Sequence, residues 1–333
     1  MRIIVPMAGR GSRLRPHTLT TAKPLLPIAG KPIVQHLVED IASIVKEDIE
    51  EIAFVIGDFG AEVERQLIDL AEKVGAKGKI YYQAEPLGTA HAIMCAAPSL
   101  SGHTVIAFAD TLFRADFTMD HEKDGVIWVK QVDDPSAFGV VQLSDNGQII
   151  EFVEKPESFV SDLAIIGIYF FKDGQNLLKE IQYLLDNNIK VKGEFQLTSA
   201  LENMKEKGKI FVPGKVNDWM DCGNKDVTVE TNGKILNYLK EQDLLSPSAS
   251  IVNSKIIQPC YIGENARIEN STVGPNVSVG NGTIIERSTI DNSIIMENSS
   301  ILNADLTNSM IGNYVKYNGN HREISLGDYS QFK

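Results

Sequence analysis

The sequence predicts an α/β fold with a mostly parallel sheet, followed by a short left-handed parallel β-helix. Two observations support this prediction. Patterns typical of buried strands and of amphipathic helices alternate through the first part of the chain, as they do in sheets whose crossovers are helices. Beyond a polar stretch at residues 246–250, aliphatic residues recur at steps of five or six. An α-helix would need a period near 3.6 and a half-buried strand strict alternation, so neither explains that spacing.

The alternation begins at the first residues. In the segment 31–46, Ile33, Leu37 and Ile41 follow the period of an amphipathic helix, and Pro32 suits its first turn. The same patterns predict the other elements of this part in order: strands at 2–8, 51–57, 79–83 and 104–110, and helices at 61–75 and 89–100. This order predicts a mainly parallel sheet that is covered by helices.

From residue 125 the pattern becomes that of hairpins. Strands are expected at 125–132, 138–143, 149–155 and 163–171, and the turn 144–148 carries the sequence SDNGQ. We expect an antiparallel extension of the sheet here. Helices follow at 176–188, 196–208 and 227–242.

The spaced aliphatic residues predict the β-helix. In such a repeat each short strand places one aliphatic side chain in the coil interior, while small polar residues form the corners. The residues expected inside are Ile251, Ile257, Ile262, Ile268, Val273, Val279, Ile284, Ile290, Ile295, Ile301, Leu306 and Ile311. They would form about three to four coils, enough to bury a continuous column. The alternative, a polar linker, gives no reason for regular spacing.

Length and composition set further limits. The chain has 333 residues, so we expect two domains, at 1–243 and 244–333. Its net charge of −12 argues against a nucleic-acid partner, because such proteins carry a basic face. The three cysteines are scattered without C-x-x-C spacing, which favours neither disulfides nor zinc. With no cleavable signal and no membrane-spanning run, we expect a cytoplasmic protein that binds no membrane.

The first strand leads into the loop PMAGRGSRLRPHT at 6–18, which concentrates positive charge on Arg10, Arg13 and Arg15. It is not a Walker A loop, because no Gly-Lys-Ser/Thr follows. Nor is it a dinucleotide fingerprint, since Leu14 stands where the third glycine belongs. The remaining interpretation is a loop whose backbone N–H groups surround phosphate oxygens while Arg13 neutralises their charge.

The longer segment GRGSRLRPHTLTTAKPLLPIAGKP resembles the signature of sugar-1-phosphate nucleotidyltransferases, a G-x-G-[ST]-R-L-x-P loop followed by K-P-x-L-P. The resemblance implies a Rossmann-like nucleotidyltransferase domain over the first part of the chain. It also implies that Lys23 contacts the phosphates at the reacting centre. The loop residues implied to bind the nucleotide are Ala8, Gly9, Gly11, Ser12 and Arg13, and Arg13 is implied to contact the triphosphate.

Other motifs of that family appear in order. QAEPLGTAHA resembles its base-recognition loop, which implies nucleotide contacts from Gln83, Pro86, Gly88 and Thr89. An amide side chain and a nearby backbone amide can pair with the edge of a pyrimidine. FADT and WMDCG match the segments that carry the family's metal ligands, which implies that Asp110 and Asp221 bind Mg²⁺. Two carboxylates together with phosphates are the usual way to hold this ion.

The segments that resemble the family's sugar-binding motifs lie between Asp110 and Asp221 in the sequence. FVEKP resembles the motif in which Glu154 would bind sugar hydroxyls and Lys155 the sugar phosphate, while Gly139 and Gly167 would line the same pocket. The catalytic set implied is Arg13, Lys23, Asp110 and Lys155. Asp162 and Leu163 stand where the family often has an Asn-Tyr pair, which leaves the sugar open. The histidines His17, His36, His91, His103 and His121 show no ligand spacing and receive no role.

The activity implied is the reaction of an NTP with a sugar 1-phosphate to give an NDP-sugar and pyrophosphate. EPLGTAHA favours dTTP with glucose 1-phosphate, with UTP next, although EPLGTA also occurs in mannose-1-phosphate guanylyltransferases. One rival is an acyltransferase, since many of these use a β-helix; however, residues 251–318 contain no histidine base. The other is a non-catalytic subunit, which usually lacks the arginine, the lysine or an aspartate. The open ends of the coil predict a homo-oligomer.

Overall fold

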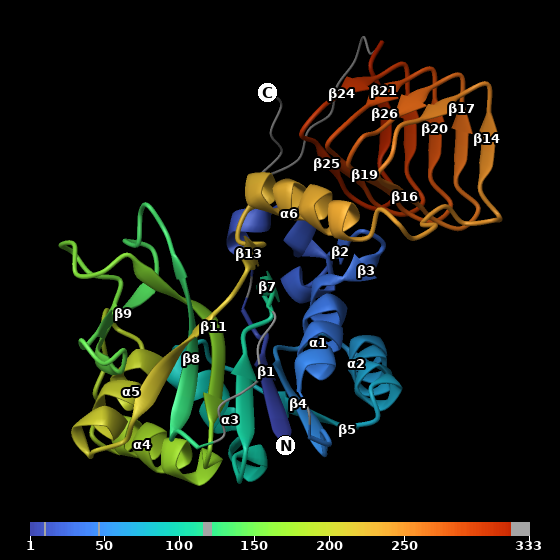
Figure 1. The fold of residues 1–333 in the computed structure, drawn as a ribbon. Coiled ribbons are helices and arrows are strands. Elements are labelled where there is room, and N and C mark those ends of the chain that lie inside the picture. Colours follow the sequence, from blue (N-terminus) through green and yellow to red (C-terminus); the bar gives the residue numbers. More distant parts are fainter. Residues whose placement is uncertain (10, 46, 116–121, 321–333) are drawn as a thin grey trace. The chain divides into compact units, whose positions relative to one another are not determined.

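The computed structural model describes residues 1–9, 11–45, 47–115 and 122–320 (Figure 1). Arg10, His121 and the end of the predicted second domain, 321–333, lie outside these residues. The chain divides into two compact units: Met1–Gly9 with Val34–Trp219, and Arg10–Ile33 with Met220–Lys333. The units therefore alternate along the chain, whereas the predicted domains follow one another at residue 243. The second unit holds both the β-helix and the segment 10–33.

The parallel part of the main sheet lies in the first unit. β1 pairs with β4 on one side and β6 on the other, and β4 pairs with β5, in each case parallel. The bounds are β1 (Arg2–Pro6), β4 (Glu51–Ile56), β5 (Lys77–Tyr82), β6 (Thr104–Ala107), α1 (Ile33–Ile44), α2 (Ala61–Lys73), α3 (Thr89–Cys95) and the 3₁₀ turn Ala97–Ser99. The predicted alternation of strand and helix is confirmed.

The antiparallel extension is confirmed as well. β11 joins it to the parallel part by pairing antiparallel with β6, β8 and β9, and β9 forms a hairpin with β10. β12 adds a parallel strand beside β8, and β7 pairs with β13 in a separate two-stranded sheet. The elements in this part of the chain are β7 (Thr111–Arg114), β8 (Gly125–Gln131), β9 (Gly139–Leu143), β10 (Ile149–Glu154), β11 (Leu163–Phe171), α4 (Gly174–Asp186), α5 (Leu197–Glu206), β12 (Phe211–Lys215) and β13 (Asp218–Asp221). α4 begins before the predicted residue 176 because the Asp173 side chain accepts the Gln175 N–H at 2.9 Å, which caps the helix.

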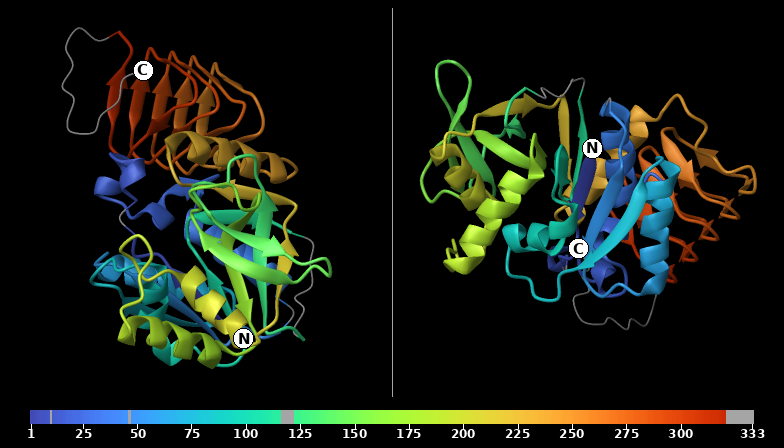
Figure 2. Two further views of the ribbon diagram at one scale, coloured as in Figure 1. Left: turned by 90° about the vertical axis from the view of Figure 1, so that its left-hand side faces the viewer. Right: turned by 90° about the horizontal axis from the view of Figure 1, so that it is seen from below.

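The second unit contains a parallel β-helix. Its strands form three parallel sheets, and the strands of successive coils lie side by side in the left view of Figure 2. One turn of the coil takes 17 residues, as from Ser254 to Ser271, or 16, as from Ser288 to Ala304. The strands are β14 (Ser250–Val252), β15 (Lys255–Ile256), β16 (Cys260–Ile262), β17 (Arg267–Glu269), β18 (Thr272–Val273), β19 (Val277–Val279), β20 (Ile284–Glu286), β21 (Thr289–Ile290), β22 (Ile294–Ile295), β23 (Ser300–Leu302), β24 (Asp305–Leu306), β25 (Met310–Ile311) and β26 (Lys316–Asn318).

The interior column of the β-helix corrects three predicted residues. Ile256 packs against the core and Ile285 is fully buried in it, in place of the predicted Ile257 and Ile284. The predicted steps of five and six were placed in the wrong order at these two points, which moved each assignment by one residue and so to the opposite face. Ile251 is 38% exposed and lies outside the core, because it belongs to the first strand of the stack.

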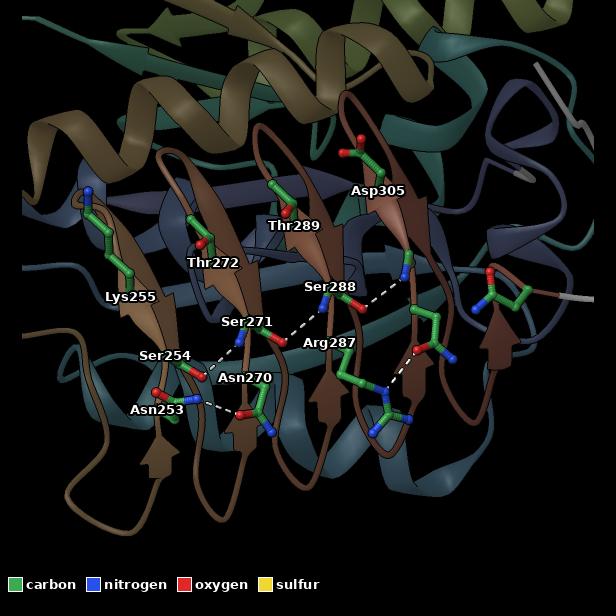
Figure 3. Close-up of a pocket in the computed structure, with 13 residues that line it drawn as sticks. Asn253, Ser254, Lys255, Asn270, Ser271, Thr272, Arg287, Ser288, Thr289 and Asp305 are labelled. Atoms are coloured by element: carbon green, nitrogen blue, oxygen red, sulfur yellow. Dashed lines mark hydrogen bonds between the residues drawn. The ribbon is translucent and has the colours of Figure 1, made fainter.

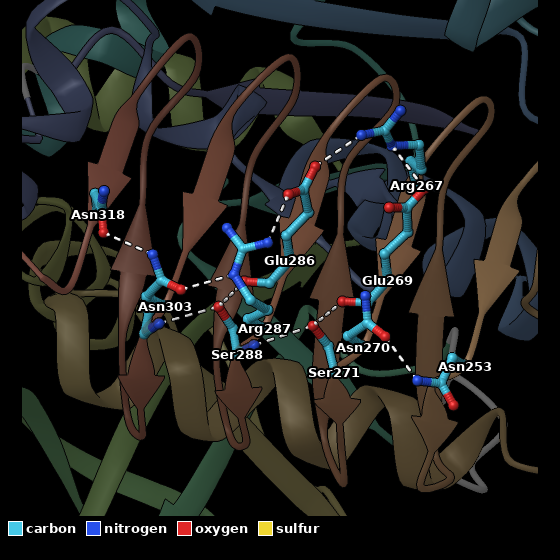
Figure 4. A network of polar contacts seen from close by, with 11 residues as sticks. Asn253, Arg267, Glu269, Asn270, Ser271, Glu286, Arg287, Ser288, Asn303 and Asn318 are labelled. Atoms are coloured by element: carbon cyan, nitrogen blue, oxygen red, sulfur yellow. Dashed lines mark hydrogen bonds and ion pairs between the residues drawn. The ribbon is translucent and has the colours of Figure 1, made fainter.

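The corners of the coil explain the abundance of asparagine. Asn253, Asn270 and Asn303 have φ values of 47°, 50° and 50°, a left-handed conformation that asparagine tolerates. Their side chains also bond between coils, with Asn253 Nδ2 donating to Asn270 Oδ1 at 2.6 Å (Figure 4). Arg287 takes the same corner in the third coil with φ 48° and donates through Nε to Asn303 Oδ1 at 2.8 Å. A parallel row of serine hydroxyls accepts backbone N–H groups from the next coil.

The remaining elements of the second unit are α6 (Lys225–Tyr238) and the short elements of segment 10–33. α6 begins before the predicted residue 227 because Asn224 Oδ1 accepts the N–H groups of Asp226 and Val227. The elements of segment 10–33 are the 3₁₀ turns Ser12–Leu14, His17–Leu19 and Lys23–Leu25 and the hairpin strands β2 (Pro27–Ile28) and β3 (Lys31–Pro32). In the described part of the chain, no helix combines the length and apolar character needed to span a bilayer.

Candidate functional site

The carboxyl ends of the parallel strands bring several predicted site residues to one edge of the first unit. Ala8 and Gly9 follow β1, Gln83 follows β5 and Asp110 follows β6. Hydrogen bonds tie these ends together: Gln83 N donates to Ile56 O at 2.9 Å, and Ala109 N to Pro6 O at 3.4 Å. Open α/β sheets bind ligands at this edge, so the placement agrees with the predicted nucleotide and metal roles.

Gly88 holds the predicted base loop against the segment before α5. Its φ is 117°, and a Cβ at this position would lie 2.5 Å from Phe195 O and 2.7 Å from Phe195 N. Phe195 N donates to Leu87 O at 2.9 Å, while Thr89 Oγ1 accepts the N–H of Leu197 at 2.9 Å. Only glycine fits this close approach. The Thr89 hydroxyl is therefore occupied in fixing the loop, and Pro86 is exposed beside it.

The side chain of Gln83 lies across the same loop. Its Nε2 is 3.3 Å from Gly88 O and 3.1 Å from His91 Nδ1. Burial lowers the pKa of His91, although Glu85 opposes that effect, so the imidazole is neutral at pH 7. His91 thus belongs to the base loop although the sequence analysis gave it no role. The signal was its place within the QAEPLGTAHA motif rather than any metal-ligand spacing.

The sugar-side residues Gly139 and Glu154 are ladder partners in the β9–β10 hairpin. A Cβ on Gly139 would lie 3.2 Å from Glu154 Oε2, so the glycine leaves room for that carboxylate. Thr198 Oγ1 donates to Glu154 Oε2 at 3.1 Å, and the Glu154 side chain is only 15% exposed. The sequence analysis missed Thr198, which comes from the distant helix α5 and carries no local signal.

Lys155 leaves the end of β10 in the left-handed region, with φ 45°. Its N–H donates to Phe138 O at 3.1 Å, and Lys192 Nζ donates to Lys155 O at 2.9 Å. The side chain is half-exposed, with Nζ 3.8 Å from Glu154 Oε1. These backbone contacts fix a partly exposed ammonium beside the Glu154 carboxylate.

Tyr169 is influenced by Glu154, a predicted sugar ligand, and by Asp110, a predicted metal ligand. Burial raises the pKa of the Tyr169 phenol, and the charges of Glu154 and Asp110 raise it further. Both carboxylates therefore lie close enough to act on one phenol. Gly167, two residues earlier, has φ 86°, and its carbonyl accepts the Phe108 N–H at 2.9 Å. The predicted residues Gly167, Glu154 and Asp110 are thus brought together in the first unit.

The second unit holds the later part of the predicted phosphate loop, of which the structure describes residues 11–18. Gly11 has φ 59°, and a Cβ there would lie 2.8 Å from Lys23 Cβ and 3.1 Å from Thr18 Cγ2. Thr18 Oγ1 donates to Gly11 O at 2.7 Å, which closes the loop on itself. Lys23 is 7% exposed, whereas Ser12 and Arg13 are exposed. The absence of a side chain at Gly11 therefore lets the loop contact the lysine that the resemblance assigns to the reacting centre.

Asp221 ends β13 and also belongs to the second unit. A Cβ on Gly223 would lie 2.7 Å from Asp221 Oδ2, which explains the glycine of the W-x-D-x-G motif. Thr231 Oγ1 donates to Asp221 O at 2.8 Å. Among the described residues, no group of three or more His, Cys, Asp or Glu side chains is placed to hold a metal. The predicted donor set has two carboxylates with phosphate oxygens, which suits Mg²⁺.

A separate groove of about 850 Å³ runs along the β-helix (Figure 3). Its walls are three rows of residues that repeat once per coil. One row consists of Lys255, Thr272, Thr289 and Asp305. The serine and asparagine rows are engaged in the ladders between coils, and none of the predicted site residues lines the groove.

Comparison with known proteins finds similarity to nucleotidyltransferases. The profile of the Nucleotidyl transferase family matches residues 3–237. The chain is 30% identical over 295 residues to a glucose-1-phosphate thymidylyltransferase of Streptomyces antibioticus, covering 81% of this chain and 80% of the relative. It is also 30% identical over 278 residues to the mannose-1-phosphate guanylyltransferase catalytic subunit beta of Drosophila melanogaster, covering 80% and 72%.

Among solved structures, the chain resembles a Bacillus anthracis protein in complex with sucrose, named as a candidate glucose-1-phosphate thymidylyltransferase. The TM-score is 0.59 and the identity 25%, over 70% of this chain and 94% of that one. The likeness supports the nucleotidyltransferase fold described above.

Proposed function

Because the chain belongs to the nucleotidyl transferase family, and the relatives named above are sugar-phosphate nucleotidyltransferases, we propose that it transfers a nucleotidyl group from an NTP to a sugar 1-phosphate, forming an NDP-sugar and pyrophosphate. The observation that carries this proposal lies in the first unit, where Gln83 and Asp110 follow the carboxyl ends of parallel strands and the charges of Asp110 and Glu154 both act on the Tyr169 phenol. The packing of Gly11 against Lys23 in the second unit supports it.

The chemistry follows from charge. A sugar 1-phosphate is ionised at neutral pH, so its oxygen can attack the α-phosphorus without a general base. The obstacle is repulsion between two anions, which Arg13, Lys23 and Lys155 would offset while holding the reactants in line. Asp110 and Asp221 would hold Mg²⁺, which when bound adds further positive charge beside the phosphates. Ala8, Gly9, Gly11 and Ser12 would present backbone N–H groups to the triphosphate.

For the substrates we propose dTTP and glucose 1-phosphate, with UTP as the nearest alternative and GTP with mannose 1-phosphate after it. The EPLGTAHA loop and the similarity to a thymidylyltransferase support the first choice. The similarity to a guanylyltransferase at the same identity supports keeping the last. Gln83, Gly88 and the neighbouring Pro86 and Thr89 would bind the base, while Gly139, Glu154 and Gly167 would line the sugar pocket.

A pyrophosphate-release screen over five NTPs and several sugar 1-phosphates with Mg²⁺ tests the proposal. We expect dTTP with glucose 1-phosphate to give the fastest turnover. Lys23→Ala and Asp110→Asn should each lower turnover by at least about 100-fold, as expected for loss of a transition-state contact. Lys73→Ala, on the exposed side of α2, is the matched control and should leave turnover unchanged. Release from no pair of substrates would instead favour a non-catalytic subunit.

We also propose that the protein acts in the cytoplasm as a homo-oligomer, without a nucleic-acid or membrane partner. The support for assembly is the first strand of the β-helix. β14 pairs with β17 on one side only among the described residues, and Ile251 and Val252 on it are 38% and 51% exposed. An unpaired apolar edge is a template for another chain. A second copy could pair through its own β14.

A further inference from the structure

We propose that Asn232 of α6 is a positioning residue, through which the β-helix fixes the segment that carries Lys23. This inference rests on the proposed function, because it assigns Asn232 an effect on the lysine at the reacting centre. Asn232 is completely buried, and an asparagine in that position must have hydrogen-bond partners or destabilise the fold. Its partners come from two parts of the second unit that are far apart in the sequence.

On one side Asn232 holds a hairpin turn. Its Oδ1 accepts the backbone N–H of Ala29 at 2.9 Å, in a buried contact. Ala29 and Gly30, with φ values of 46° and 83°, form the two-residue turn between β2 and β3. Left-handed conformation at both positions is the geometry of a type I′ turn, which is costly for an alanine. The hydrogen bond that Ala29 donates to Asn232 offsets part of that cost at the strained residue itself.

On the other side Asn232 is held by the β-helix. Ser278 Oγ of β19 donates to the same Oδ1 at 2.7 Å, and Asn232 Nδ2 donates to Asn276 O at 3.3 Å. The ring of Tyr261, on β16, covers the turn so closely that any side chain on Gly30 would collide with it. Two neighbouring coils of the β-helix therefore contact the turn, one through the Asn232 amide and one directly.

The chain between this turn and Lys23 is short and rigid. Leu26 N donates to Lys23 O at 3.1 Å, and Ile33 N to Leu26 O at 3.1 Å. Leu26 and Ile28 are fully buried. Lys23 in turn packs against Gly11 of the phosphate loop. A displacement of the turn would therefore also displace Lys23 and Gly11, because packed interiors transmit strain.

The test compares Asn232→Ala with Thr283→Ala in the whole protein. Thr283 is a matched control: it is fully buried, and its hydroxyl donates to Met296 O and accepts the Ser299 N–H, both within the β-helix. Hydrogen exchange followed by mass spectrometry reports the segment 23–33. We expect exchange there to be about 10-fold faster in Asn232→Ala and unchanged in Thr283→Ala, because local opening follows loss of local bonds.

Kinetics with pyrophosphate release supply the second measurement. Asn232→Ala should lower kcat by about 10-fold while KM for the sugar phosphate stays within about 2-fold, since a misplaced lysine weakens the transition state more than sugar binding. Thr283→Ala should keep kcat. Unchanged exchange in 23–33, or faster exchange with normal kcat, would overturn the inference. If Asn232→Ala does not fold, Ser278→Ala, which removes one donor to Asn232, should give the same two changes at smaller size, and their absence would count against the inference equally.

The two proposals can fail separately. A wild-type protein that releases no pyrophosphate from any substrate pair contradicts the proposed function. Exchange in 23–33 is then still measured, and protection that does not depend on Asn232 contradicts the positioning role by itself.

Discussion

At the scale of single residues, Gly88 and Gly11 mark two places where the chain approaches itself closely. Gly88 permits the contact between the base loop and Phe195, and Gly11 permits the contact between the phosphate loop and Lys23. The sequence analysis assigned both glycines to ligand binding through the resemblance. The structure adds a second reason for them, because a side chain at either position would collide with backbone or with a buried lysine stem.

Gly88→Ala tests this reason directly. The new Cβ would meet the Phe195 backbone at 2.5 Å and would also force an alanine to φ 117°. We expect the free energy of unfolding to fall by about 2 kcal/mol or more, the size of a combined strain and collision effect. We also expect KM for the nucleotide to rise. Urea denaturation and steady-state kinetics measure the two.

Gly147→Ala is the control for that experiment. Gly147 has φ 78° but nothing within 4 Å of the added Cβ, so it carries backbone strain without the collision. It should cost about 1 kcal/mol, the penalty for a left-handed L-residue, and leave the nucleotide KM unchanged. Equal losses in the two variants would show that backbone strain alone explains Gly88.

Sequence patterns predicted the site unevenly at this scale. Residues inside a contiguous motif could be named as candidates, such as Gln83, Gly139 and Glu154. Thr198 was missed because it reaches Glu154, at the end of β10, from helix α5, and nothing within α5 distinguishes it from an ordinary polar position. His91 was given no role because only metal spacing was considered, whereas its contact is with an amide.

At the scale of elements, the hydrophobic pattern identified helices and strands, but it did not fix where the helices begin or which residues of the β-helix face inward. The spacing of apolar residues predicted the strands, the hairpin and the β-helix, because each of these structures requires a regular pattern of apolar and polar positions. The start of α4 and of α6 was misplaced by two residues where Asp173 and Asn224 provide the caps. In the β-helix, adjacent aliphatic residues such as Ile284 and Ile285 satisfy the pattern equally well, and only packing decides between them.

Substitution of that pair provides a test of register. Ile285 is fully buried in the core column, whereas Ile284 is half-buried on the outer surface of the coil. Ile285→Ala should lower the free energy of unfolding by about 2–5 kcal/mol through lost burial and a cavity. Ile284→Ala should cost less than about 1 kcal/mol. Chemical denaturation of the two variants decides, and the reverse order would favour the register that the sequence pattern predicted.

At the scale of the whole molecule, the sequence could not predict that the compact units interleave. Segment 10–33 packs with α6 and the β-helix because Ala29, Gly30 and His17 find their contacts there. These are long-range contacts between small or polar residues, and they leave no periodic signal. The predicted domains, at 1–243 and 244–333, therefore placed segment 11–33 and the β-helix in different domains.

The proposed homo-oligomer would form through the exposed edge of β14. Val252→Lys places a charge on the exposed edge of β14, which should prevent pairing with a second copy. We expect the variant to have a smaller mass than the wild type in light scattering after gel filtration. Lys240→Ala, on an exposed residue after α6, is the control and should leave the mass unchanged. A wild-type mass of one chain would contradict assembly altogether.

The burial of His17 leads us to expect that the packing of its segment against the β-helix weakens at low pH. A Cβ on Gly312, in the fourth coil, would lie 3.7 Å from His17 Nδ1, so the imidazole packs against the β-helix. Burial lowers the pKa of His17 below its ordinary value of 6.5. Below pH 6.5 the unfolded chain therefore binds more protons at this residue than the folded chain does. The contribution of His17 to the free energy of unfolding is fully present above pH 6.5. It is lost as the pH falls from 6.5 through the pKa of His17 in the folded protein.

Urea denaturation of the wild type and of His17→Gln at pH 7.5 and 5.5 measures this contribution. The wild type should lose more unfolding free energy between the two pH values than the variant, because the variant has no imidazole to protonate at this site. His91, whose pKa burial also lowers, is present in both proteins and cancels in the comparison. Hydrogen exchange over 11–25 should rise at pH 5.5 in the wild type after correction for the intrinsic rate. Equal losses in both proteins would mean that protonation of His17 does not loosen the segment from the β-helix.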